Sequence, residues 1–304
     1  MIKTAIIGAS GFIGSHLWQS YRRVFPDCVG TSFSRPAPGL CPFDIRRPDL
    51  TRLRLEETGH QAVLITSAKS NISFCDQEPA DAQAVNVAGT IELIRQIGRT
   101  SMSIIFFSSD YVFEGTTGRY ADTAVVNPTT AYGRHKVIVE QAIPPLVENY
   151  LILRLSKIYG LEKNDGTILD DIARSLATGK EILAAPDQYF CPIEVSDLIR
   201  AVHVVQDCET RRVMNVCSSE SWSRYEIACA MAEAMRANVG RIKKIRLHDI
   251  PALQGRPLNL TMVCSQMKYD ADVLFRPLRE SIKRVSANWI GTLHEQSISQ
   301  PCLA

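Results

Sequence analysis

A hydroxyl, a phenol and an ammonium occur within a short stretch in the middle of this chain. Ser109 ends the apolar run 104–107, and Tyr132 and Lys136 follow in a segment with a helical pattern. Residues four apart lie on one face of a helix, so the phenol and the ammonium point the same way. The ammonium favours the phenolate by Coulomb attraction, which makes the phenol a usable proton donor near neutral pH. A YxxxK pair alone is common by chance. It indicates an active site only if the N-terminal segment also predicts a cofactor-binding turn.

A glycine-rich turn near the N-terminus predicts a phosphate-binding loop. It follows the predicted strand Thr4–Ile7 and opens a predicted helix over residues 11–23. Gly8 allows a tight turn, Gly11 lets the backbone approach a pyrophosphate, and Gly14 lets helix and strand pack closely. The helix N-terminus adds free N–H donors and the positive end of its dipole. The GxxGxxG spacing predicts dinucleotide binding by Gly8, Ser10, Gly11, Phe12, Ile13 and Gly14.

The residues after the second predicted strand indicate which dinucleotide binds. A free ribose 2′-hydroxyl needs a carboxylate there, whereas a 2′-phosphate needs a cation. Residues 31–35 contain no acid, and Ser34 with Arg35 suits a phosphate, so NADP(H) is favoured over NAD(H). The alternative is that Arg35 is a solvated loop residue. Further along the chain, we expect Asp44 and Ile45 beside the adenine, and Thr66, Ser67 and Ala68 beside the central ribose and phosphates.

Composition excludes several classes of protein. The 304 residues carry a formal charge of only +2, so nucleic acid is not an expected partner. There is no apolar stretch long enough for a membrane span, and glycines interrupt the N-terminal apolar run of a would-be signal peptide. The nine cysteines are scattered without a CxxC pair, which is typical of reduced thiols. We therefore expect a cytoplasmic protein.

Strand-length apolar runs alternate with helical patterns through the first half of the chain. This alternation predicts an α/β fold with a Rossmann-type, doubly wound parallel sheet, followed by a smaller mixed C-terminal lobe. We expect a Rossmann domain over residues 1–160 and the lobe over 161–304, with elements at about 190–217 returning to the sheet. The predicted strands are 4–7, 28–33, 63–65, 104–107 and 150–153, and the predicted helices are 11–23, 79–97, 131–142, 168–178, 224–237 and 278–290. Residues 241–246 read as the solvated side of a further strand.

These motifs resemble the extended short-chain dehydrogenase/reductase superfamily, and most of all the dTDP-4-dehydrorhamnose reductase family. The resemblance covers nearly the whole chain. Its most specific pieces are the SSDYVFEG block at 108–115 and the RPLN block at 256–259. The others are the glycine-rich turn, Asn127-Pro128 ahead of Tyr132, Arg154-Leu155-Ser156 with Tyr159-Gly160, Asp187-Gln188 with Pro192, and Ser265-Gln266-Met267.

The resemblance implies roles for individual residues. Ser109 would hold the carbonyl of the sugar, Tyr132 would donate the proton, and Lys136 would bind the nicotinamide ribose and lower the pKa of the tyrosine. Asp110 would also touch the sugar, while Ser108 is expected only to satisfy backbone groups. The implied reaction is hydride delivery from NADPH to C4 of a nucleotide-linked 4-keto-6-deoxysugar. A homodimer is implied, and no protein-bound metal is expected, although magnesium on the substrate phosphates stays open.

Three other functions stay open. A 4,6-dehydratase would need a second carboxylate where Tyr111 stands, and a C4 epimerase with tightly bound NAD would need an acid near Arg35. The same block also resembles the regulatory β subunit of methionine adenosyltransferase, a binding protein that keeps the NADP-binding fold. The chain departs from the reductase pattern at residues 65–68, 189–191 and 261–264, which border the sugar in that family.

Overall fold

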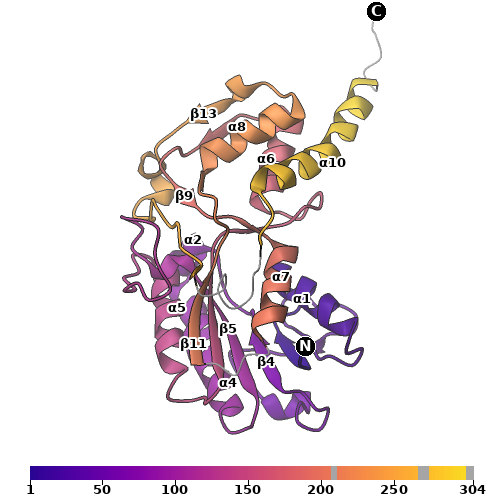
Figure 1. Ribbon diagram of the computed structural model, residues 1–304, viewed down its shortest axis with the longest axis vertical. Helices are drawn as coiled ribbons and strands as arrows, with labels where there is room; N and C mark the ends of the chain where they lie inside the picture. Colours follow the sequence, from indigo (N-terminus) through magenta and orange to yellow (C-terminus); the bar gives the residue numbers. More distant parts are fainter. Residues whose placement is uncertain (207–210, 266–273, 299–304) are drawn as a thin grey trace, which may run out of the picture.

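A five-stranded parallel sheet forms the centre of the fold. The computed structural model describes residues 1–206, 211–265 and 274–298. The strand order is β1-β4-β5-β6-β11 (Figure 1), and the strands are β1 (Thr4–Ile7), β4 (Ala62–Ile65), β5 (Ser103–Ser109), β6 (Tyr150–Leu155) and β11 (Arg211–Val216). Strands buried on both faces need continuous apolar runs, which is why these stretches form the sheet. The predicted Rossmann-type fold is confirmed.

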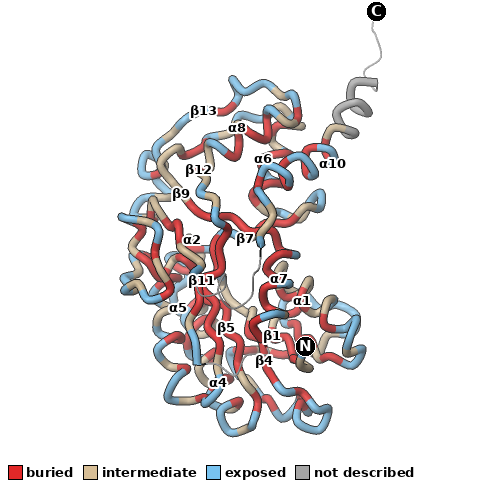
Figure 2. Tube along the Cα trace, viewed as in Figure 1, coloured by how far each residue is buried: buried red, intermediate tan, exposed pale blue. Residues whose placement is uncertain are grey.

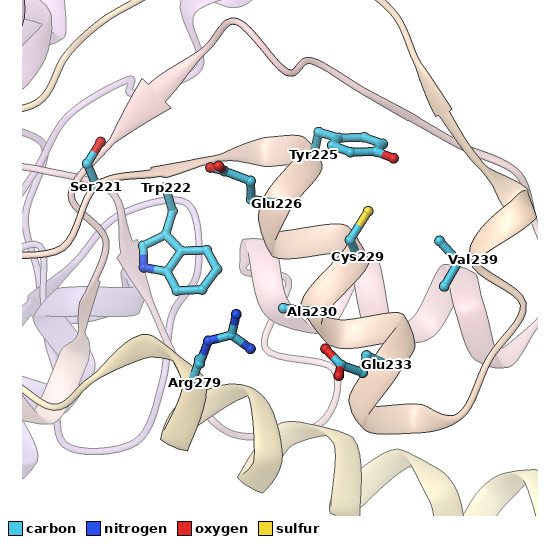
Figure 3. Close-up of a pocket in the computed structure, with 9 residues that line it drawn as sticks. All are labelled: Ser221, Trp222, Tyr225, Glu226, Cys229, Ala230, Glu233, Val239 and Arg279. Carbon is cyan, nitrogen blue, oxygen red and sulfur yellow. The ribbon is translucent and has the colours of Figure 1, made fainter.

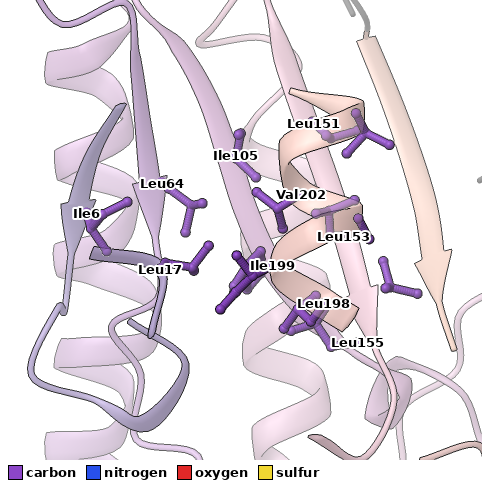
Figure 4. Packing of buried hydrophobic residues seen from close by; sticks show 14 of the residues in the cluster. Ile6, Leu17, Leu64, Ile105, Leu151, Leu153, Leu155, Leu198, Ile199 and Val202 are labelled. Carbon is purple, nitrogen blue, oxygen red and sulfur yellow. The ribbon is translucent and has the colours of Figure 1, made fainter. Parts of the chain in front are cut away.

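Helices cover both faces of this sheet. On one face, α1 (Phe12–Arg22) and α7 (Val195–Val205) pack through Leu17, Leu198 and Val202 against the strands (Figure 4). On the other face, α4 (Thr90–Ile97) and α5 (Ala131–Ala142) contribute apolar side chains to a second core cluster. The buried stretches in Figure 2 follow the strands between these two layers.

The second predicted strand is much shorter than expected. Only β2 (Thr31–Ser32) forms, and it pairs with β3 (Cys41–Pro42). The preceding backbone still lies beside β1, because the Ile6 amide donates to the Val29 carbonyl oxygen at 2.8 Å, but the Val29 amide donates to Nε2 of His60 and the bridge from Gly30 to Ile6 is isolated. The prediction of a strand from residue 28 to 33 was therefore wrong at both ends.

The predicted helix over residues 79–97 is interrupted. It divides into α3 (Pro79–Gln83), a π-helical turn (Ala84–Gly89) and α4, after the short helix α2 (Ile72–Gln77). At the wide turn, the buried side chain of Asn86 accepts from the Lys69 amide and donates to the Lys69 carbonyl oxygen. Single π turns of this kind occur within helices where a residue has a local role, here the hydrogen bonds of Asn86 to the Lys69 backbone.

A smaller lobe lies above the carboxyl ends of the strands (Figure 1). Its core lies among α6 (Ile168–Ala177), α8 (Arg224–Met235) and α10 (Leu278–Ile298). Three short strand pairs complete it and join it to the sheet: β8 (Ile182–Ala184) with β13 (Ile242–Lys244), β9 (Tyr189–Phe190) with β12 (Trp222–Ser223), and β7 (Ile158–Tyr159) with β10 (Ile193–Glu194). The expected solvated strand is β13, where Lys243 and Lys244 are exposed. Helix α10 runs past the predicted end at residue 290.

Within the described part of the chain, no helix has the length and apolar character that a bilayer crossing requires. The seven cysteines in that part are all thiols, as the sequence predicts.

Candidate active site

The residues predicted for the site line two adjoining cavities at the carboxyl ends of the parallel strands. The main cavity measures about 810 Å³ and the side cavity about 290 Å³. Ser109, Asp110, Tyr132, Lys136, Phe12, Ile13 and Gly14 line the main cavity. Gly8, Ser10, Ser34, Asp44, Ile45 and Ser67 line the side cavity. Gly11, Arg35, Thr66 and Ala68 line both, so the structure brings the whole predicted set together.

The glycine-rich turn has the geometry of a phosphate cradle. Gly8 has a φ of +93°, which favours glycine, and a Cβ on Gly14 would lie 2.2 Å from the carbonyl oxygen of Gly8. No side chain caps the N-terminus of α1 at Gly11, and the first turn of the helix carries no acid. The first N–H groups of α1 therefore remain available to an anion.

Basic side chains surround the side cavity. Arg35 lies at the boundary of the two cavities, and Arg46, which sequence reasoning missed, lines the side cavity next to Asp44. Asp44 was expected to accept from an adenine amine. Its Oδ2 accepts from Nη2 of Arg46 at 2.8 Å and its Oδ1 from Nε at 3.0 Å, so both carboxylate oxygens already have a partner. The Arg46 guanidinium also lies 4.8 Å from the centroid of the Phe33 ring.

Tyr132 and Lys136 lie on the buried face of α5, near the end of β5. Thr130 caps the helix by accepting from the Gly133 amide at 3.1 Å, which sets where the helix begins. The Lys136 ammonium donates to the carbonyl oxygen of Phe107 at 2.7 Å and lies 5.6 Å from the centroid of the Tyr132 ring. Both side chains are almost completely buried.

Burial dominates the protonation of this pair. It raises the pKa of Tyr132 above the ordinary value, while an interaction with Ser109 acts in the opposite direction. Burial also lowers the pKa of Lys136 to about 8, against the attraction of Glu140. The expected lowering of the tyrosine pKa by Lys136 is not found, because burial has the largest effect and raises the pKa of the phenol.

Ser109 and Asp110 form a hydrogen-bonded pair at the end of β5. The Ser109 hydroxyl donates to Oδ1 of Asp110 at 2.9 Å. Burial raises the pKa of Asp110 to about 7, although the bond from Ser109 and the charge of Lys157 lower it. The expectation for Ser108 was wrong. Its buried hydroxyl has no hydrogen-bond partner in the described chain, and the residue lines the main cavity, so it satisfies no backbone group.

Three cations that were not predicted as site residues line the main cavity. They are Lys157, Arg224 and Arg256. Burial lowers the pKa of both Lys157 and Arg224, and no carboxylate of the described residues lies within salt-bridge distance of either. Arg256 donates to the Ser73 hydroxyl at 2.7 Å and hydrogen-bonds with Tyr111. Arg256 could have been predicted as a site residue because it belongs to the RPLN block. No sequence motif other than their charge marks Lys157 and Arg224.

Comparison with known proteins gives the family. Residues 2–290 match the family described as RmlD substrate binding domain. The β subunit of methionine adenosyltransferase 2 from Xenopus laevis is 23% identical over 88% of this chain and 81% of its own length. A probable low-salt glycan biosynthesis reductase, Agl14 of Haloferax volcanii, is 25% identical over 83% of this chain and 86% of its own.

A solved structure shows the same fold. The dTDP-4-dehydrorhamnose reductase of Bacillus anthracis, crystallised with NADP, is 20% identical to this chain and has a TM-score of 0.82, covering 94% of this chain and 99% of its own. Because the family match spans nearly the whole sequence, this protein belongs to the RmlD substrate binding domain family.

Proposed function

We propose that this protein is an NADPH-dependent oxidoreductase that reduces the 4-keto group of a nucleotide-linked 4-keto-6-deoxysugar. One observation carries the proposal. Ser109, Tyr132 and Lys136 line the same cavity as the glycine cradle at the start of α1. A proton donor and a dinucleotide-binding turn that open into one space are what carbonyl reduction by a nicotinamide requires.

The residues present fit NADP(H). The uncapped N-terminus of α1 suits the pyrophosphate, and Ser34 with Arg35 suits a 2′-phosphate. The two acids that line the side cavity, Asp44 and Asp81, are both paired with cations. Asp44 is the acid nearest in sequence, and its oxygens are occupied by Arg46. When bound, the cofactor supplies the hydride that reduces C4.

The protein's own residues would bind and protonate the carbonyl oxygen. Ser109 would donate a hydrogen bond to it, and Tyr132 would give the proton that turns the developing alkoxide into a hydroxyl. Contact with the Lys136 ammonium would stabilise the phenolate left behind, so that the donor can be reprotonated. The burial of Tyr132 and Lys136 keeps bulk water away from this proton transfer.

The cations on the lobe side of the main cavity favour a doubly charged substrate. Lys157 follows β6, Arg224 opens α8, and Arg256 belongs to the RPLN block, so all three come from the chain after residue 150. Three positive charges face one cavity, and they repel one another unless an anion binds between them. A diphosphate would meet this need, and the sugar attached to it would then extend toward Ser109.

The test combines purified protein with NADPH and a panel of nucleotide-linked keto sugars. Oxidation of NADPH is measured as the loss of the nicotinamide absorbance. We expect oxidation of NADPH only with a 4-keto-6-deoxysugar, and identification of the product as the 4-hydroxy sugar by mass spectrometry. NADPH binding measured by calorimetry serves as the control. Binding without turnover across the panel would contradict the reductase proposal.

A second function deserves the same experiment. The likeness to the β subunit of methionine adenosyltransferase 2, which extends over most of both chains, favours a regulatory subunit that keeps the nucleotide-binding fold. In that case NADPH would bind, no keto sugar would be reduced, and size-exclusion chromatography with a methionine adenosyltransferase catalytic subunit would show a complex.

A further inference from the structure

Three cysteines from distant parts of the chain meet where the lobe joins the sheet. Cys191 lies between β9 and β10, Cys217 directly follows β11, and Cys264 follows the RPLN segment. All three belong to one apolar cluster, together with Val112 and Met262. Cys191 and Cys217 are 3% and 2% exposed, whereas Cys264 is partly exposed.

The three thiols lie against backbone carbonyl oxygens of the same small cluster. Cys191 and Cys217 both direct their thiols at the carbonyl oxygen of Met262, with Sγ–O distances of 3.9 and 3.3 Å. The Sγ of Cys264 lies 3.0 Å from the carbonyl oxygen of Asn215, two residues before Cys217. Interactions with the thiols of Cys191 and Cys264, together with burial, raise the pKa of Cys217.

We propose that Cys217 and Cys264 form a peroxide-sensitive disulfide site. The Cys264 thiolate would attack hydrogen peroxide, giving a sulfenic acid and hydroxide. The sulfur of Cys217 would then attack the sulfenic sulfur, forming the S–S bond as the hydroxyl leaves and takes the thiol proton as water. In total, two thiols are oxidised to one disulfide while one peroxide is reduced to two waters.

The division of roles follows from exposure and contact. Peroxide must reach its target from solvent, and Cys264 is the partly exposed member of the cluster. Cys217 is buried against it, and contacts with the other two thiols and burial raise its pKa, so Cys217 suits the second step and not the first. Cys191 has the pKa of its thiol lowered by the hydrogen bond with Cys217, but it is shielded from solvent.

The disulfide would tie the end of β11 to the segment that borders the main cavity. In that segment Leu260 lines the cavity, and its amide donates to the carbonyl oxygen of Tyr189 at 2.9 Å. The inference does not rest on the proposed reaction, because disulfide formation is measured without substrate.

The experiment uses full-length protein with Cys208→Ser and Cys302→Ser, so that every remaining cysteine lies in the described part of the chain. After treatment with hydrogen peroxide, we expect the intact mass to fall by two hydrogen atoms and dithiothreitol to restore it. Peptide mapping under non-reducing conditions should link Cys217 to Cys264. Failure of the link to form would overturn the proposal.

Variants of the cluster separate this site from general oxidation. Cys264→Ser and Cys217→Ser should each abolish the mass loss. Because Cys264 is partly exposed, the Cys264→Ser variant still tests the pair if the Cys217→Ser variant does not fold. Cys191→Ser retains a hydrogen-bonding group beside Cys217 and should leave the link unchanged. Cys229→Ser is the outside control, since Cys229 lies on α8 in a groove with Trp222 and Arg279 (Figure 3). Equal mass loss in Cys264→Ser would refute the assigned pair.

Discussion

The ammonium of Lys136 donates a 2.7 Å hydrogen bond to the carbonyl oxygen of Phe107, and this bond ties the active-site helix to the end of the central strand. The same ammonium lies 4.6 Å from the centroid of the Phe106 ring and 5.6 Å from that of Tyr132. Lys136 therefore has a structural contact as well as its inferred role. Because burial lowers its pKa to about 8, the ammonium persists below that pH and is lost above it.

Replacing Tyr132 by Phe should remove the proton donor while keeping the ring in place. General acid catalysis contributes about 10²–10⁴ in rate, and we expect a loss of kcat of that size with little change in NADPH affinity. Tyr111→Phe is the matched control, because Tyr111 also lines the main cavity and its ring centroid is 6.2 Å from that of Tyr132. Full turnover in Tyr132→Phe, measured as NADPH oxidation, would show that the acid is assigned wrongly.

Asp110 should impose a pH dependence on turnover. With a pKa raised to about 7, it is protonated below that pH and ionised above it. The ionised carboxylate accepts the Ser109 proton, as in the structure, which withholds that proton from the substrate. A protonated carboxyl can instead donate to the Ser109 oxygen and free the hydroxyl proton. We therefore expect kcat to decline as pH rises through about 7.

The variant that checks this is Asp110→Asn. Its amide can donate to Ser109 at any pH, so turnover should persist and the decline near pH 7 should disappear. The remaining decline near pH 8 would belong to Lys136. A pH–rate profile unchanged in Asp110→Asn would rule out the carboxyl as its source.

Arg35→Ala should weaken NADPH binding far more than NADH binding. A charge-assisted contact with the 2′-phosphate contributes about 1.5–3 kcal/mol, so we expect a loss of about tenfold to a hundredfold in NADPH affinity alone. Arg46→Ala is the comparison, because Arg46 pairs with Asp44 and stacks on Phe33, and its loss should affect both cofactors. Calorimetry with the two nucleotides decides the matter. Equal weakening of both by Arg35→Ala would remove the argument for 2′-phosphate recognition.

Residues that act through local geometry were predictable from the sequence. The cradle from Gly8 to Gly14 and the pair Tyr132 and Lys136 depend on a turn and on helical spacing, which the sequence shows directly. The parallel sheet followed from apolar runs alternating with helices. The predicted helix 131–142 matches α5, whose N-terminus Thr130 caps.

Features that depend on tertiary partners were not predictable. Arg224 reaches the cavity because α8 packs over the strand ends, and nothing local to it shows this. The second strand is shorter than predicted, and the Val29 amide before it donates to His60, which is distant in sequence. The protonation of Tyr132 followed burial, which a sequence motif does not measure. Gln266 and Met267 of the late block lie outside the described residues.

The buried pair of Glu140 and Arg154 should carry much of the local stability around the active-site helix. Arg154 donates to Glu140 through Nη2 at 2.7 Å and Nε at 3.1 Å, and both side chains are 7% exposed. Glu140→Gln leaves the guanidinium buried without its counter-charge, which costs about 3–5 kcal/mol of unfolding free energy. Urea unfolding measures this loss, and the double variant Glu140→Leu/Arg154→Met, which removes both charges, should recover most of it.

The same substitution tests whether the pair also acts on Lys136. Glu140 is one helical turn beyond Lys136, and its negative charge raises the pKa of that ammonium against burial. Removing the charge should therefore move the alkaline decline of turnover to lower pH, because the ammonium is lost sooner as pH rises. Glu140→Asp, which keeps the charge, should leave the decline nearer its original position. If Glu140→Gln unfolds more easily but keeps the same pH profile, the pair stabilises the fold without influencing the site.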